Sequence, residues 1–306
     1  MKKFLKYLNP LNYLRFIKKN GLSGLFGLFS RADTIRAYWY RYPYGENFGD
    51  AITPYLIKKM TGKEPLFCSQ FCLKEYYIIC GSVISRANRN AIIWGAGIED
   101  RYEKIRRPKK ILAVRGPLTR QRLQELGYDC PEVYGDPTLL LPNFYIPQSE
   151  KRYKLGIIPH CLDYAKVKEK INSEDILVIN VLDSVEKVLD DIYSCEKTLS
   201  SSLHGIIASN TYGIASTWVE FSKKLTGDGS KFIDYFLSIN TKPYKPVNLI
   251  NEIPNSKILI DIANKNGRMI NQIDIDKLMK TCPFNCQWKG DCLPKDTKSF
   301  IVLTKK

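Results

Sequence analysis

The sequence predicts an α/β fold in which two parallel-sheet domains face a cleft, with a basic helical segment before them and a mostly helical tail after them. Compact apolar runs ending in glycine alternate with amphipathic stretches, this alternation occurs twice, and a polar linker separates the two series. At 306 residues the chain is long enough for two packed cores. The expected boundaries are 1–34 for the basic segment, 35–148 and 149–240 for the domains, and 241–306 for the tail.

The first domain should open with a strand in TIRAYWY, followed by a turn in RYPYGENFGD and a helix in AITPYLIKKMT that Gly62 closes. Three later apolar runs are typical of buried parallel strands with tight turns after them: YYIICGSVI, AIIWGAGI and ILAVRG. A helix should then run from Pro117 to the stop at Gly127.

The second domain should follow the linker NFYIPQSEKRYK. LGIIPH and DILVIN read as strands, and SVEKVLDDIYSC reads as an amphipathic helix with its apolar residues on one face. A short strand near EKTLS, a helix opened by SSLHG and a strand at IASTWV complete the series. Both series therefore have the order expected of doubly wound sheets.

The formal net charge of +16 is unevenly distributed, because residues 1–36 carry +7 and the other 270 carry +9. A helix expected at 9–21 combines one apolar face with basic residues, which suits either an anionic membrane surface or packing on its own domain. The overall charge suits an anionic partner, although scattered lysines also serve solubility alone. No apolar run reaches the roughly 18 residues that span a bilayer, and the start lacks a secretory pattern, so we expect a cytoplasmic protein.

Nine cysteines form an odd, scattered set, which favours reduced thiols in the cytoplasm over a disulfide framework. Cys68 and Cys72 lie close in sequence, as do Cys282, Cys286 and Cys292. Neither group has paired C-x-x-C spacing or a neighbouring histidine, so the sequence predicts no metal site.

The stretch LSSSLHG places His204, one of only two histidines, at the mouth of a predicted helix. A serine-rich loop opening a helix presents hydroxyls and free N–H groups, and the helix dipole favours an anion there. An imidazole beside a bound anion is suited to acid–base chemistry. A capping or packed histidine is the alternative interpretation.

Three further positions are candidates on local grounds. Arg115 lies at the carboxyl end of a strand, where a guanidinium could hold phosphate or carboxylate, or else form an ion pair with a neighbouring helix. The turn GENFGD, which contains Asn47 and Asp50, could cradle an anion or a sugar. Asp136, beside Pro137, is by default a turn-stabilising residue.

Taken in order, several motifs resemble the polysaccharide pyruvyl transferase family over roughly residues 45–240. They are NFGDAITPYL, IWGAGI, AVRGPLTRQRLQELG, GDPTLLLP, LGIIPH, SSLHGIIASNTYGI and TGDGSKFIDYF. The resemblance implies two Rossmann-like domains arranged as in the GT-B glycosyltransferases. It also implies transfer of the pyruvyl group of phosphoenolpyruvate onto two sugar hydroxyls, with release of phosphate.

The resemblance assigns roles residue by residue. His204 matches the catalytic histidine, and Arg115 matches a donor-binding arginine. Ser201, Ser202, Leu203 and Gly205 at the helix mouth would contact the donor, and a further set would line the cleft or the acceptor side: Asn47, Asp50, Asp136 and His160. For His160, which also matches a family position, capping of its strand is the alternative interpretation. Some family members have arginine where this chain has Ser202, which leaves the second cationic contact to Arg120 or to a lysine from elsewhere.

The implied partners are phosphoenolpyruvate as co-substrate and a sugar acceptor, which we expect to be a lipid-linked saccharide. An anionic membrane surface is a further expected partner of residues 1–34, and no separate cofactor is expected. Two alternatives remain open from the sequence: a GT-B-type glycosyltransferase that uses a nucleotide sugar, and a non-catalytic basic scaffold. Trp218 and Tyr212 could stack on a sugar or belong to the core. No nucleic-acid motif accompanies the charge, so nucleic acid is not an expected partner.

Overall fold

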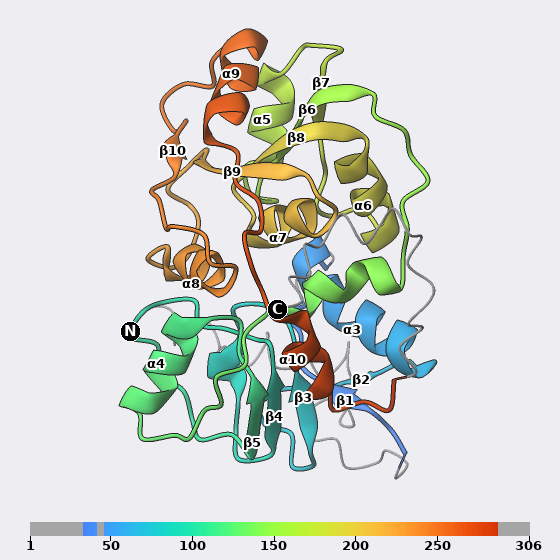
Figure 1. The fold of residues 1–306 in the computed structure, drawn as a ribbon, viewed down its shortest axis with the longest axis vertical. Coiled ribbons are helices and arrows are strands. Elements are labelled where there is room, and N and C mark those ends of the chain that lie inside the picture. Colours follow the sequence, from blue (N-terminus) through green and yellow to red (C-terminus); the bar gives the residue numbers. More distant parts are fainter. Residues whose placement is uncertain (1–32, 42–45, 287–306) are drawn as a thin grey trace, which may run out of the picture.

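The computed structural model describes residues 33–41 and 46–286 and shows an α/β fold with two five-stranded sheets, each wholly parallel. Figure 1 shows one sheet in the lower half of the molecule and the other in the upper half, with helices between them. The basic helix predicted at 9–21 and the last part of the tail, 287–306, lie outside the described residues.

The first sheet has the order β2-β1-β3-β4-β5 and comes from the chain before residue 114. Its central strands are short and buried, as apolar runs flanked by turn residues predict. Its strands are β1 (Arg36–Ala37), β2 (Leu66–Phe67), β3 (Tyr76–Ile78), β4 (Ala91–Trp94) and β5 (Lys110–Ala113).

The second sheet has the order β10-β9-β8-β6-β7, so its last edge strand comes from beyond residue 240. The register pairs Leu199 of β8 with Ile157 of β6 and with Thr217 of β9. Its strands are β6 (Tyr153–Ile158), β7 (Ile176–Val178), β8 (Cys195–Ser200), β9 (Ala215–Glu220) and β10 (Val247–Asn248).

Most helices begin and end near the predicted local signals, but α3 begins at Phe48, three residues before the predicted start at Ala51, because Asn47 caps it. Asn47 caps α3 and Gly62 ends it in the left-handed conformation, while Pro117 opens α4. The elements are α3 (Phe48–Thr61), η1 (Ile84–Arg86), α4 (Pro117–Glu125), η2 (Pro137–Asn143), α5 (Tyr164–Lys170), α6 (Val185–Tyr193), α7 (Leu203–Thr211), α8 (Ser230–Ser238), α9 (Ser256–Asn266) and α10 (Ile275–Lys280).

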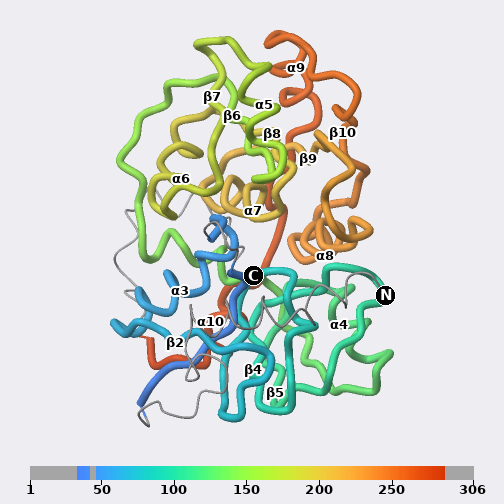
Figure 2. The backbone as a smooth tube through the Cα atoms, turned by 180° about the vertical axis from the view of Figure 1, so that it is seen from behind, coloured from blue at the N-terminus to red at the C-terminus, as the bar shows by residue number. Residues whose placement is uncertain are grey.

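The two halves meet through helices that pack between the sheets. One hydrophobic core includes residues of both halves, such as Ile93 of β4 and Ile158 of β6. α7 packs against η2, α3 packs against α6 and α7, and α4 packs against α8. Figure 2 shows the same arrangement from behind, with α7 and α8 facing the first half. The two sheets agree with the prediction, while the cleft between GT-B-like domains stays a prediction.

The chain beyond residue 240 takes part in both halves. β10 extends the second sheet beside β9, and α9 packs against that sheet. α10 reaches the first sheet, where the indole Nε1 of Trp94 donates to the carbonyl of Leu278 at 3.1 Å. Across the described ranges, no helix has the length and apolarity that a membrane span requires.

Candidate active site

His204 lies in the first turn of α7, at the edge where the carboxyl ends of the second sheet's strands face the other half. Ser202 caps this helix without a side-chain hydrogen bond, so the first N–H groups of α7 lack a hydroxyl cap. Ser202 and His204 are partly exposed, whereas Ser201, Leu203 and Gly205 are buried. The helix mouth therefore presents one hydroxyl, one imidazole and uncapped N–H groups.

The His204 ring lies against Asp136, with 3.6 Å between Nε2 and the carboxylate Oδ2. Both atoms are shielded from solvent, and neither has a hydrogen-bond partner in the part of the chain that the structure describes. The side chain of His204 keeps 12% of its surface exposed, while that of Asp136 is fully buried. Because the enclosed nitrogen faces the carboxylate, the partly exposed remainder of the ring faces outward.

Asp136 is held in place by the turn that the sequence predicted. Its Oδ1 accepts from the backbone N–H of Thr138 at 3.0 Å and from the Thr138 hydroxyl at 2.6 Å, capping η2. Burial raises the pKa of the Asp136 carboxyl, but contact with His204 and the bonds from Thr138 outweigh it, so the pKa lies below its ordinary value. The turn thus holds an ionised carboxylate behind the imidazole.

Gly49 makes room for the imidazole at the start of α3. A Cβ at this position would overlap Nδ1 and Cγ of the His204 ring. The start of α3 is tied to the second half because the Phe48 N–H donates to the carbonyl of Val181, between β7 and α6, at 2.6 Å. α3 also packs against α7. The NFGD motif therefore contacts the histidine from the first half, as Asp136 does.

Asp50 follows Gly49 and is tied to the cap of α3. Asn47 Oδ1 accepts from the Asp50 N–H at 3.2 Å, and the Asn47 amide donates to Asp50 Oδ2 at 2.6 Å. Desolvation, reinforced by the charges of Glu46 and Glu99, raises the pKa of Asp50 to about 8, although the bond from Asn47 and the charge of Lys231 oppose this. Asp50 is thus a carboxyl group that titrates near neutral pH.

Lys231 of α8 adds a positive charge near Asp50 and His160. The Nζ of Lys231 forms an ion pair with Glu99 Oε1 at 3.2 Å, and its side chain is 15% exposed. Desolvation lowers the pKa of His160, and the charge of Lys231 lowers it further. The His160 N–H in turn donates to the hydroxyl of Ser201 at 2.9 Å. Charged groups from both halves therefore surround the mouth of α7.

Arg115 lies deeper than the sequence suggested. Its guanidinium is fully buried and donates to Asp234 Oδ2 at 3.0 Å, to the Ser82 hydroxyl at 2.8 Å and to the carbonyl of Ile98 at 2.6 Å. A Cβ at Gly97 would overlap the guanidinium. This is the ion pair with a neighbouring helix that the sequence left open, since Asp234 belongs to α8. Direct contact between Arg115 and a donor stays a prediction.

The structure thus gathers five of the predicted site residues around one helix mouth: His204, Asp136, Ser201, Asp50 and His160. Asn47 caps α3, Gly205 packs against Ser200 and Ile158, and the guanidinium of Arg120 donates to the carbonyl of Cys130. Trp218 packs face to face with Phe232 at 4.2 Å, and Tyr212 is buried, so both lie in packed aromatic contacts.

Sequence reasoning did not single out Gly49, Glu99 or Lys231. The only available signal was the presence of Gly49 in NFGD and of Lys231 in TGDGSKF, two motifs that were noted as wholes. Glu99 carried none, because its contacts are with residues more than a hundred positions away in the chain. In the ranges 33–41 and 46–286, no three His, Cys, Asp or Glu side chains are grouped to hold a metal ion.

Fold and site define an α/β protein with a carboxylate-backed histidine at a helix mouth between two parallel sheets. Comparison with known proteins gives the family. The model of the polysaccharide pyruvyl transferase family matches residues 7–222, and the chain belongs to this family. It is also 34% identical to the uncharacterized protein L143 of Acanthamoeba polyphaga mimivirus over 230 residues, which cover 71% of this chain and 79% of that protein. No solved structure matches it.

Proposed function

We propose that this chain transfers the pyruvyl group of phosphoenolpyruvate onto two hydroxyls of a sugar in a surface-polysaccharide precursor and releases phosphate. Membership of the family supports pyruvyl transfer to a polysaccharide sugar. The proposed donor and mechanism are supported by the pairing of His204 with the buried carboxylate of Asp136 at a helix mouth. This arrangement suits a reaction that needs one proton donor beside an anionic substrate.

His204 would act as the general acid. Asp136 at Nε2 sets the ring's orientation and tautomer, so Nδ1 is the nitrogen left to exchange a proton with substrate. The proton goes to the methylene carbon of phosphoenolpyruvate, and positive charge develops at the carbon that bears phosphate. One sugar hydroxyl bonds to that carbon, the phosphate leaves with its bridging oxygen, and the second hydroxyl closes the ketal. Of the two hydroxyl protons, one restores the histidine and one leaves on phosphate.

Two further residues fit this chemistry. Lys231, whose charge acts on both Asp50 and His160, would hold the carboxylate or phosphate of the donor, the contact for which the sequence lacks the arginine of other members. Uncapped N–H groups of α7 and the Ser202 hydroxyl would share that anion. Asp50, with a pKa of about 8, would in its ionised form accept the proton of the attacking hydroxyl and pass it to the departing phosphate.

The acceptor in this proposal is a sugar with two neighbouring hydroxyls, carried on a lipid at the cytoplasmic face of the membrane. Residues 1–36 hold a net charge of +7, which would keep the enzyme near an anionic membrane surface. The glycosyltransferase alternative loses ground, because the family that matches the chain transfers pyruvyl groups.

The test is phosphate release. Purified protein should release phosphate from phosphoenolpyruvate in step with the ketal methyl signal in NMR, when supplied with free or lipid-linked galactose, glucose or N-acetylmannosamine. His204→Gln should lower the rate by about 100-fold or more, the usual reach of general acid–base catalysis, without changing the melting temperature appreciably. Undiminished turnover in that variant would refute the role of His204, and absence of turnover with every acceptor would refute the proposed reaction.

A further inference from the structure

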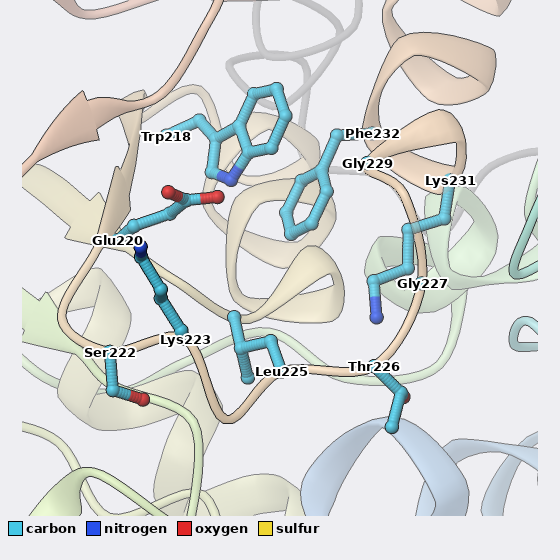
Figure 3. Close-up of a pocket in the computed structure, with 10 residues that line it drawn as sticks. All are labelled: Trp218, Glu220, Ser222, Lys223, Leu225, Thr226, Gly227, Gly229, Lys231 and Phe232. Atoms are coloured by element: carbon cyan, nitrogen blue, oxygen red, sulfur yellow. The ribbon is translucent and has the colours of Figure 1, made fainter.

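A pocket lies beside the active site, on loop 221–229 and the start of α8. Its volume is about 210 Å³, and its wall includes Trp218 and Glu220 from the end of β9 together with Lys231. Lys231 also forms the ion pair with Glu99 and acts on Asp50, so the pocket adjoins the group around His204. Figure 3 shows its side chains surrounding one space.

The indole N–H of Trp218 has no acceptor. Trp218 is 4% exposed, and its Nε1 is fully shielded without a hydrogen-bond partner among the described residues. In Figure 3 this nitrogen points toward the carboxylate of Glu220, which no described group bonds. Leaving a buried donor unpaired costs free energy, so this N–H is available to an acceptor that enters the pocket.

The pocket wall offers both hydrogen-bond donors and hydrogen-bond acceptors. Glu220 accepts hydrogen bonds, while the Trp218 N–H and the ammonium groups of Lys223 and Lys231 donate, and the Ser222 hydroxyl does both. A hydroxyl can accept from the indole and donate to the carboxylate at once. A phosphate would meet the negative charge of Glu220, and an amide or carboxylate could not satisfy both groups with a single atom.

The size of the pocket and its apolar wall limit the class of ligand further. About 210 Å³ lies below the roughly 300–1,000 Å³ of pockets that take drug-sized molecules, so the space suits a single ring better than a nucleotide sugar. Phe232 and Leu225 supply an apolar side on which the C–H groups of a sugar ring can pack.

We infer that this pocket binds the monosaccharide unit that accepts the pyruvyl group, with its hydroxyls held between Trp218 Nε1 and the carboxylate of Glu220. The inference rests on the proposed function for the fate of the sugar but not for its binding. It differs from the sequence-based expectation for Trp218, because the ring face is already occupied by Phe232 at 4.2 Å and only the N–H is offered.

Two conservative variants test the site. Trp218→Phe removes the indole N–H and keeps an aromatic ring, and Glu220→Gln removes the carboxylate charge and keeps the size. Each should raise the dissociation constant of the accepted sugar by about tenfold or more, the cost of losing a hydrogen bond in a buried or charged setting. Tyr244→Phe is the matched control, because the Tyr244 hydroxyl accepts from the backbone N–H of Trp218 outside the pocket wall.

Binding of galactose, glucose and N-acetylmannosamine is measured by calorimetry and saturation-transfer NMR, with and without phosphoenolpyruvate. Weakened sugar binding in both variants, with unchanged binding in Tyr244→Phe and an unchanged response to phosphoenolpyruvate, supports the site. Wild-type sugar affinity in both variants overturns it, and so does failure of all three sugars to bind the wild-type protein, which would mean that only water satisfies the indole.

The outcomes separate the two proposals. If the variants lose sugar binding but phosphoenolpyruvate is neither bound nor consumed, the sugar site stands and the proposed reaction fails. If turnover proceeds with an unchanged acceptor KM in both variants, the reaction stands and this site is wrong.

Discussion

At the scale of single residues, His204 depends on a partner that lies 68 positions earlier in the chain. Asp136 presents Oδ2 to the imidazole at 3.6 Å while Thr138 holds Oδ1, so each carboxylate oxygen has a separate function. Sequence reasoning placed Asp136 on the acceptor side of a cleft. Its full burial behind the ring instead makes it a positioning residue in the proposed reaction.

Asp136→Asn tests this positioning. The amide keeps the shape of the side chain and the bond from Thr138 but removes the charge that fixes the tautomer of His204, so kcat should fall by about 100-fold or more. The donor KM and the melting temperature should change little, because Asp136 would not touch the donor. Phosphate-release kinetics measure the split between kcat and KM, with Thr138→Ser as a control that keeps the hydroxyl bond. A raised donor KM at unchanged kcat would show that Asp136 acts in binding instead.

At the scale of elements, α4 and α8 are joined by a buried charge cluster. Asp234 of α8 accepts from the Arg115 guanidinium, from the Thr119 N–H at 3.0 Å and from the Thr119 hydroxyl at 2.7 Å, so it caps α4 from another element. The cap residue of α4 is Gly116, which has no side chain to do this. Since Lys231 also lies on α8, this cluster positions the cation of the site.

Removing either Arg115 or Asp234 from their buried ion pair should destabilise the folded chain. Asp234→Ala or Arg115→Ala leaves a buried charge unpaired and should lower the free energy of unfolding by about 3–5 kcal/mol. The double variant Arg115→Met, Asp234→Leu should recover part of that loss, because no lone charge remains. Urea unfolding measures all three, and additive losses in the double variant would contradict the coupling.

The same double variant addresses the predicted donor contact of Arg115. If Arg115 only positions α8 and does not touch the donor, phosphoenolpyruvate should still raise the melting temperature of the folded double variant. Loss of that stabilisation in a folded protein would support direct binding of the donor by the guanidinium.

At the scale of the whole molecule, the two halves meet where charges are crowded. Glu46, Asp50 and Glu99 come from the first half, and Lys231 and His160 come from the second. Cys161 also lies near enough for the charge of Asp50 to affect its pKa. The protonation of Asp50 therefore couples the stability of the folded chain to pH.

The sign of this coupling follows from the two pKa values. Asp50 titrates near 3.8 in the unfolded chain and near 8 in the folded one, so between these values only the folded form keeps the proton. The loss of stability from ionising buried Asp50 is absent below about pH 4, grows as pH rises and is complete above about pH 8. Asp50→Asn should therefore be more stable than the wild type above pH 8, with a difference that vanishes near pH 4. Urea midpoints across this range test it, and parallel curves would contradict it.

Local chemistry was sufficient for much of the fold. Glycine-ended apolar runs, Pro117 and the helix after SSLHG specify their elements through nearby atoms, and the structure confirms them. The Asn47 cap was not predicted, and it starts α3 within the segment expected to be a turn. Strand order was not readable, because β10 pairs with β9 through contacts made across the chain.

The sequence by itself determined the α/β fold with two parallel sheets, the family, and the histidine at a helix mouth, since each depends on local periodicity, turn chemistry or motif order. Only the tertiary structure decided which groups face that histidine. Asp136 behind the ring, the space left by Gly49 and the burial of Arg115 against Asp234 all join residues distant in sequence. Such contacts arise from packing between elements, and no local pattern encodes them.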